Sequence, residues 1–551
     1  MDEKYDEGVA HDKYDVGHMQ DADVPHLAKE QEGLKRDLRL RHMVMIAVSG
    51  TIGTGLFLTS GKSIFQAGPA GALLAYVLVG LWLVFVCQAI GEVATLLPLP
   101  GAFNAWGGRV FDEAFSFQMT WMYFINWALT IPSELSASAI IVKFWLPADS
   151  NFPVWVVPLL IIIVMVFINL VGVKAYGELE YWFSILKVLT IIIFIICGIL
   201  VDAGAVGGHK YGMDAWHGAG TPFKGGFLGF IGTLVNVGYA YGGTEMTGVT
   251  AAESRNPHKH VPKAVNTVLV RIAFFYIVSV FLIASIIRND DPQIANANGT
   301  ASGAPFTLVF VKAGMSGAAN YMNAVVFTSV FSAINSDFYV ATRMLLSLAR
   351  NGWAHSIIGY TNSRGVPLVA LAIVTLCSCL SLLTIFIGSS VVFNWFVSVI
   401  GSIIFQSWIF ILMLHFRFRY CWKKQGRSIS ELPYVSWGYP YGNIFALILG
   451  TLIIIATCYL SVIDPPHRAD FDNDTDFNSA RDTYAQNLLG AWFPWVCSLF
   501  LYVGYKIVRK TPFIRAEDAD LDTGRFIPTE ADKQDLIVHG PWWKRVISFL
   551  I

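Results

Sequence analysis

Two apolar stretches of the sequence carry glycine clusters at positions where an unbroken helix would be expected. The first cluster is Gly50-Thr51-Ile52-Gly53-Thr54-Gly55, and the second runs from Gly238 to Glu245. Each Gly weakens a helix by about 1 kcal/mol relative to Ala, so both helices are expected to be interrupted. An interrupted helix offers N–H groups that can bind a carboxylate and carbonyls that can bind an ammonium. Together the two segments predict a site for a small zwitterion, of which a free amino acid is the simplest example.

Packing of helices through small residues is the alternative interpretation of these glycines. Glu245 disfavours it, because a carboxylate inside a membrane span is costly and usually functional. Glu245 could accept a hydrogen bond from the ligand ammonium or stabilise the interruption itself. Tyr239 and Tyr241 could close the site as an aromatic gate or could pack in the core. The candidate binding residues are Thr51, Ile52, Gly53, Thr54, Gly55, Tyr239, Ala240, Tyr241, Gly243, Thr244 and Glu245.

Two further charged residues lie inside apolar runs. Lys187 follows Ser184-Ile185-Leu186, and Glu134 follows Pro132-Ser133. A desolvated Lys can exchange its proton near neutral pH, whereas a Lys near the end of a span can extend its ammonium to the membrane interface. Glu134 could line the site or relay protons. It could instead pair with a helix end or a hydroxyl group, because Pro132 frees a carbonyl.

The composition places these residues in a membrane protein. Of the 551 residues, 55% are hydrophobic and 14% are charged, whereas soluble domains carry about 25% charged residues. Lys and Arg number 38 and Asp and Glu 39, a balance that disfavours nucleic-acid binding and disorder. The sequence contains no Gly-x-Ser-x-Gly, His-Glu-x-x-His or Cys-x-x-Cys motif. We therefore predict no enzymatic activity, no cofactor and no metal site.

The apolar runs predict an all-α polytopic membrane protein with twelve transmembrane helices of about 20 residues or more. Spans nine and ten are separated only by Gly388–Ser390, so the count could differ by one. The predicted spans are 42–60, 71–97, 115–145, 153–171, 182–202, 226–250, 264–288, 318–349, 367–388, 391–416, 442–464 and 488–508. The two glycine clusters fall in spans one and six, which is where two inverted five-helix repeats would place a transporter's substrate site.

The distribution of basic residues predicts the orientation of the chain. With a cytoplasmic N-terminus, twenty Lys and Arg residues flank the inner ends of the spans and seven flank the outer ends. Both termini are then cytoplasmic. The two Asn-x-Ser/Thr sequons, at Asn298 and Asn473, fall in loops on the outer side and are candidate glycosylation sites.

Several motifs resemble those of the amino-acid permeases of the amino acid–polyamine–organocation superfamily. The resemblance is carried by residues 45–57 (MIAVSGTIGTGLF), 91–101, 251–264 and 332–343, and residues 515–525 resemble the fungal members more narrowly. It implies a LeuT-like fold of two inverted five-helix repeats, about 42–202 and 226–416, with discontinuous helices one and six. It also implies proton-coupled import of amino acids across the plasma membrane by alternating access.

The resemblance further implies roles for individual residues. Lys187 would act in proton coupling, with its ammonium in the place that a sodium ion takes in sodium-coupled relatives, and Glu134 could share this role. Asn335 and Ser336 would lie beside that cation position. An amino-acid exchanger and a receptor that binds amino acids and signals through its tails are the alternatives.

The resulting organisation is a transport core between two tails. We expect an acidic disordered tail at 1–40, a ten-helix core at 41–416, a basic cytoplasmic loop at 417–441, peripheral helices at 442–508 and a C-terminal tail at 509–551. The expected partners are the amino-acid substrate, protons and the lipid bilayer. By family analogy the cytoplasmic tails could bind ubiquitin ligase adaptors.

Overall fold

The computed structural model describes residues 52–528, apart from 100, 148, 172, 218–221, 247, 249–250, 255, 292–303, 363–364, 464 and 471–472. Every regular element in this part of the chain is a helix, which confirms the predicted all-α class. The helices that frame the molecule are η2 (Gly55–Thr59), α2 (Ser60–Leu96), α3 (Phe103–Val110), α4 (Glu113–Val142), α5 (Val156–Val171), α6 (Val173–Asp202), α7 (Gly226–Tyr241), α9 (Pro257–Asn266), α10 (Val268–Arg271), η6 (Ile272–Ile277), α11 (Val278–Ile286), α13 (Pro305–Lys312), α14 (Ser316–Arg350), α15 (Leu368–Ser378), η8 (Cys379–Leu383), α16 (Thr384–Ile387), α17 (Ser389–Lys424), α18 (Tyr441–Leu460) and α19 (Asp474–Arg509).

Within the described residues, nine helical segments are long and apolar enough to cross a membrane, and α5 and α7 are shorter apolar helices. The chain is therefore polytopic, while the count of twelve spans and the LeuT-like topology stay predictions. Two glycines separate neighbouring helices. Gly68, at φ 77°, breaks the helical path within α2, and Gly388, at φ 84°, ends α16 immediately before α17 begins. Glycine has no Cβ and adopts this backbone region without strain.

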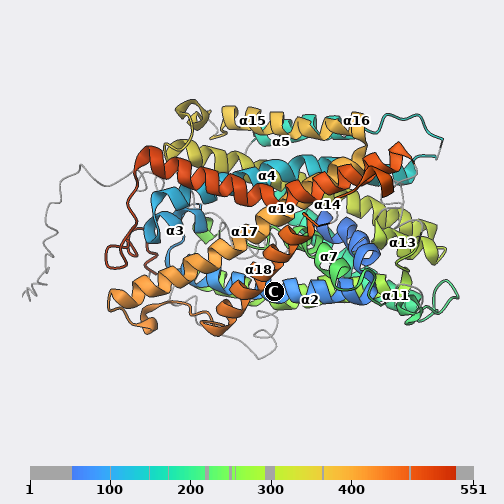
Figure 1. The fold of residues 1–551 in the computed structure, drawn as a ribbon, viewed down its shortest axis with the longest axis horizontal. Coiled ribbons are helices and arrows are strands. Elements are labelled where there is room, and N and C mark those ends of the chain that lie inside the picture. Colours follow the sequence, from blue (N-terminus) through green and yellow to red (C-terminus); the bar gives the residue numbers. More distant parts are fainter. Residues whose placement is uncertain are drawn as a thin grey trace, which may run out of the picture.

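The core forms where α4 packs against α14 and α17, and where α2 packs against α7. Figure 1 shows the long helices running along the longest axis of the molecule, with α5 and α15 at one edge and α2 and α18 near the other. In the most apolar stretch of α17, 83% of the residues are buried, whereas in the corresponding stretches of α18 and α19 only 22% are buried. The apolar surfaces that α18 and α19 leave exposed are suited to contact with lipid.

The segment that follows α19, residues 510–528, lies against the ends of several core helices. Its main chain makes two hydrogen bonds to them: Ile514 N donates to Phe111 O at 2.8 Å, and Phe526 N donates to Leu96 O at 3.1 Å. Leu521, in the middle of the segment, is buried. The segment therefore links the end of α2 to the residue that follows α3.

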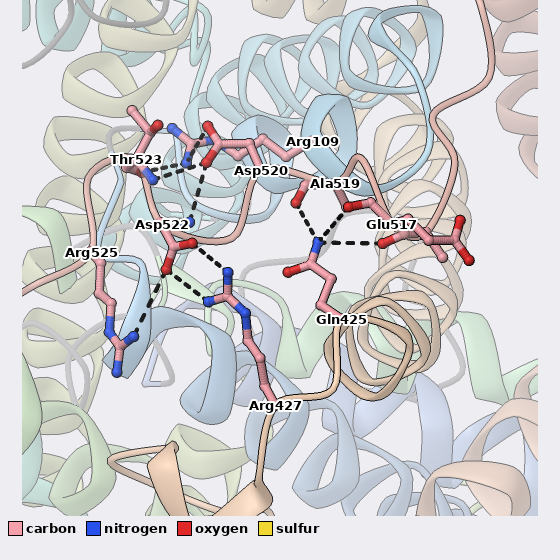
Figure 2. A network of polar contacts seen from close by, with 10 residues as sticks. Arg109, Gln425, Arg427, Glu517, Ala519, Asp520, Asp522, Thr523 and Arg525 are labelled. Atoms are coloured by element: carbon pink, nitrogen blue, oxygen red, sulfur yellow. Dashed lines mark hydrogen bonds and ion pairs between the residues drawn. The ribbon is translucent and has the colours of Figure 1, made fainter. Parts of the chain in front are cut away.

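Charged and polar side chains bind the same segment to the helix ends (Figure 2). Arg427 donates to Asp522 through both terminal nitrogens, with Nη1 to Oδ1 at 2.7 Å. Arg109 lies 3.6 Å from Asp520, and Gln425 donates to main-chain carbonyls of the segment, the shortest at 2.7 Å. The hydrogen bonds from Arg427 hold the pKa of Asp522 below its usual value. These contacts join the C-terminal end of α17 and the loop after it to the tail.

We expect Arg427→Ala and Asp522→Asn each to loosen the tail, which limited proteolysis of the folded protein between residues 510 and 528 would detect. Both residues are partly exposed, so a double-mutant cycle should give a coupling free energy of about 0.2–1 kcal/mol at pH 7. A carboxylate whose pKa is lowered by folding contributes stability above its unfolded pKa and loses it as the pH falls through the folded value. The coupling should persist at about pH 5 and should be lost only once the pH falls below the ordinary aspartate pKa of about 3.9. A coupling that grows on acidification would contradict the assignment.

Candidate functional site

The two glycine-rich segments meet in the interior of the molecule. A Cβ built on Gly55 would lie only 2.4 Å from Cα of Ala240, so the two backbones approach as closely as a glycine permits. Helix α7 ends at Tyr241, and the chain then turns through Gly243 at φ 89°. The predicted interruption of the second segment is therefore confirmed. In the first segment the described residues begin at Ile52 and continue into the π-helical turn η2.

Side chains satisfy backbone groups that the interruption frees. Tyr276 Oη donates to Ala240 O at 2.8 Å, and Thr244 Oγ1 donates to Tyr241 O at 2.8 Å. Glu245 Oε1 accepts from Gly243 N at 3.4 Å. Backbone groups at this depth must be paired within the protein, because hydrocarbon offers no partners. The surrounding side chains therefore stabilise the end of α7 by pairing its free backbone groups.

A cavity of about 80 Å³ adjoins both segments and is also lined by α4, α6, α14 and α17. Small-molecule sites usually enclose roughly 300–1,000 Å³. The cavity is therefore too small for most amino acids in this conformation, and a ligand of that size would require the surrounding helices to separate.

Glu134 of α4 connects the two interrupted segments. One carboxylate oxygen accepts a hydrogen bond from Thr54 Oγ1, and the other accepts one from Tyr239 Oη at 2.9 Å. Glu134 is 4% exposed and borders the cavity. Glu134 therefore pairs with hydroxyl groups, as the sequence allowed, and both of these belong to the glycine-rich segments. Any movement that separates the two segments must break at least one of these hydrogen bonds.

Lys187 of α6 points into the interior and not to the surface. Its side chain is 2% exposed, and its Nζ lies 4.0 Å from Glu180 Oε1, seven residues earlier on the same helix face. Ser332 Oγ of α14 donates to the same Glu180 oxygen at 2.8 Å. An ammonium extended to the membrane interface, the alternative considered for Lys187, does not occur in this structure.

The predicted site residues fall into three groups. Those that line the cavity are Gly53, Thr54, Gly55, Glu134, Lys187, Tyr239, Ala240, Gly243 and Ser336. Those that are buried but do not line it are Ile52, Tyr241, Thr244, Glu245 and Asn335. Thr51 and Asn298 lie outside the described residues, and Asn473 is exposed just before α19.

Tyr241 and Glu245, like Thr244 of the same group, have structural partners. Tyr241 Oη donates to Tyr76 O at 3.0 Å, and its ring packs on Tyr276 at 4.4 Å between centroids. Glu245 Oε2 accepts from Trp408 Nε1 at 3.4 Å, and neither residue lines the cavity. Of the two roles considered for Glu245, this placement favours stabilisation of the break.

Sequence reasoning missed two acidic residues of the cavity, Glu180 and Asp337. The signal that could have found both is their position: a carboxylate in or beside an apolar span is costly unless it faces the protein interior. Asn126 and Trp127 of α4 also line the cavity and carried no distinguishing pattern.

We predict that Gly55→Ala destabilises the protein by about 1–3 kcal/mol, because the added Cβ would have to displace the backbone at Ala240. Thermal unfolding of the purified protein in detergent would measure the effect. Gly317→Ala is the matched control, because a Cβ at this position of α14 meets nothing within 4 Å. Equal melting temperatures for the two variants would show that the close approach does not constrain the fold.

Comparison of the sequence with known proteins identifies the family of this chain. A family model described as amino acid permease matches residues 42–513. The lysine-specific permease LysP of Lactococcus lactis is 41% identical over 496 residues, which cover 89% of this chain and 93% of that protein. Cationic amino acid transporter 1 of Schizosaccharomyces pombe is 36% identical and covers 91% of this chain and 83% of its own. Amino-acid permease GAP5 of Candida albicans is 33% identical, with 95% and 83% covered. The chain belongs to the amino acid permease family.

Proposed function

We propose that the protein is a proton-coupled symporter that imports amino acids across the plasma membrane by alternating access. Amino-acid transport follows from membership of the permease family, whose members are transporters and not enzymes. The coupling to protons, the direction of transport and the residues that carry it are the proposed parts. The observation that supports them best is the cavity at which both glycine-rich segments, three carboxylates and one ammonium converge.

The zwitterionic part of the substrate would bind between residues 51–55 and 239–245. Gly53, Gly55 and Gly243 line the cavity and have no side chains of their own. Backbone groups of glycine can approach a ligand closely, with N–H groups directed at its carboxylate and carbonyls at its α-ammonium. Because the cavity of this conformation is too small for most amino acids, the substrate would bind in a conformation in which the surrounding helices have separated.

Proton coupling would depend on Lys187 and Glu134. Lys187 shares the cavity with Ser336, and its ammonium would fix α6 near α14 as a bound cation would. Glu134 holds both interrupted segments through its two hydrogen bonds. A change of protonation on either residue alters charge or hydrogen bonding between elements that must separate when the cavity opens. Binding or release of a proton would therefore shift the equilibrium between conformations with the cavity closed and open.

The remaining expectations belong to the same proposal. Both termini would face the cytoplasm, the predicted core would be built of two inverted repeats with α18 and α19 at its periphery, and Asn298 and Asn473 would be accessible for glycosylation. The cytoplasmic tails would bind regulatory partners such as ubiquitin ligase adaptors. The relatives named as lysine-specific permease and cationic amino acid transporter support amino acids as the transported class.

The decisive test is uptake of radiolabelled amino acids by proteoliposomes under an imposed inward pH gradient. We expect Lys187→Met to abolish accumulation above the external concentration, because the substituted residue cannot hold a proton. Lys210→Met is the matched control, because Lys210 is exposed in the loop after α6. Accumulation by the wild-type protein should vanish when a protonophore collapses the gradient.

Two outcomes would contradict this proposal. Uptake by the wild-type protein that persists after collapse of the gradient, and that requires amino acid inside the vesicles, would indicate an exchanger. Unchanged accumulation by Lys187→Met would remove Lys187 from the coupling mechanism. Correct folding of the variant is checked by its size-exclusion profile and melting temperature in the same detergent.

A further inference from the structure

The cavity contains more acidic than basic side chains. Among the described residues that line it, Glu134, Glu180 and Asp337 are acidic and Lys187 is the only basic one. All four are at most 4% exposed. Buried charges are stable only when they are paired or hydrogen-bonded. If Glu134 holds a proton and Lys187 pairs with Glu180, one carboxylate still has no countercharge.

The three carboxylates differ in the partners that they have. Glu134 accepts from two hydroxyl groups of the breaks, and Glu180 accepts from Ser332 and pairs with Lys187. Asp337 Oδ2 is buried and has no hydrogen-bond partner among the described residues. An unpaired carboxylate oxygen at the wall of an internal cavity is therefore open to a ligand that donates hydrogen bonds and carries positive charge.

A second free acceptor, on α4, lies at nearly the same level as Asp337. Helices α4 and α14 run antiparallel: Asn323 Nδ2 donates to Ile141 O at 3.1 Å, and Trp353, just beyond α14, donates to the side chain of the first residue of α4. Asn126 lies fifteen residues before Ile141 on α4, and Asp337 lies fourteen residues after Asn323 on α14. Because the helices are antiparallel, both residues lie at nearly the same distance from the Asn323–Ile141 contact, and so at a similar level along the two helices. Asn126 Oδ1 is likewise buried without a partner in the described structure, and both residues line the cavity.

This pair of acceptors lies away from the interrupted segments. Ser329 Oγ, at the level of the first break, donates to Ile52 O at 3.5 Å. Asp337 is eight residues farther along α14, about 12 Å of helix axis. Its side chain leans back toward the N-terminal end of the helix, and so toward the break. A ligand whose zwitterionic end is bound at the breaks would direct the end of a long side chain at Asp337.

We propose that Asp337 binds the side-chain cation of the substrate, with Asn126 as a second acceptor, so that this cavity selects cationic amino acids. A lysine ammonium or an arginine guanidinium carries only donors and one positive charge, which matches two free acceptors and one unbalanced carboxylate. The inference rests on the proposed function, since it assigns the side-chain class of the substrate to the same site.

The first test compares lysine with norleucine, which has the same carbon chain but lacks the ammonium. In proteoliposomes with an inward pH gradient, unlabelled arginine should compete with labelled lysine, and norleucine should compete at least about tenfold less well. Lysine should also raise the melting temperature of the detergent-solubilised protein more than norleucine does. Equal competition and equal stabilisation by the two compounds would overturn the inference.

The second test compares two variants of cavity carboxylates. Asp337→Asn should weaken lysine competition by about tenfold or more and leave norleucine nearly unchanged, so the ratio between them collapses. Asp337→Glu should recover part of the lysine preference. Glu180→Gln is the matched control: it removes the partner of Lys187 and should lower uptake of both compounds while keeping their ratio. A ratio that survives in Asp337→Asn would contradict the assignment.

The outcomes separate this inference from the proposed function. Gradient-driven uptake of neutral amino acids without a lysine preference would refute the side-chain assignment and leave proton symport intact. Lysine-selective stabilisation and uptake that do not respond to the gradient would refute proton symport and leave the assignment intact. If Asp337→Asn does not fold, the comparison of lysine with norleucine on the wild-type protein still decides the question.

Discussion

The constraint on which the rest of this structure depends is that backbone groups inside a membrane must find partners within the protein. Helix α7 ends after Tyr241, and neighbouring residues compensate for this end locally. Gly55 lies against Ala240, Tyr276 and Thr244 donate to freed carbonyls, and Glu245 accepts from a freed N–H group. Glycines of both segments line the cavity beside these paired groups.

The buried charges follow from the same constraint. A carboxylate or ammonium inside an apolar bundle is tolerated only beside a cavity or a partner. Glu134 is held by hydroxyl groups of both breaks, Lys187 is held by Glu180, and Asp337 faces the cavity. The site therefore joins two kinds of chemistry in one place: backbone groups suited to a zwitterion, and side chains that can change charge. Movement of α4, α6 or α14 relative to the breaks would alter both at once.

The rest of the chain supports this centre from outside. Helix α4 is packed against α14 and α17, while α18 and α19 present apolar surface away from the core. The segment after α19 returns to the ends of α2, α3 and α17 and is fixed there by Arg427, Gln425 and Arg109 (Figure 2). Contacts that span several helix ends resist relative displacement of those helices. The tail is thus mechanically connected to the elements that surround the site.

The sequence by itself determined the membrane class, the helical content and the end of a helix within residues 238–245, because apolar length and glycine content are local properties. It also identified Lys187 and Glu134, since a charge in an apolar run is conspicuous without any structure. Only the tertiary structure decided which faces meet: it placed Tyr241 and Glu245 away from the cavity and brought Glu180 and Asp337 into it. The physical reason is that the sequence determines the position of a residue along its helix. Packing between helices determines whether that side chain faces the cavity, another helix or the lipid.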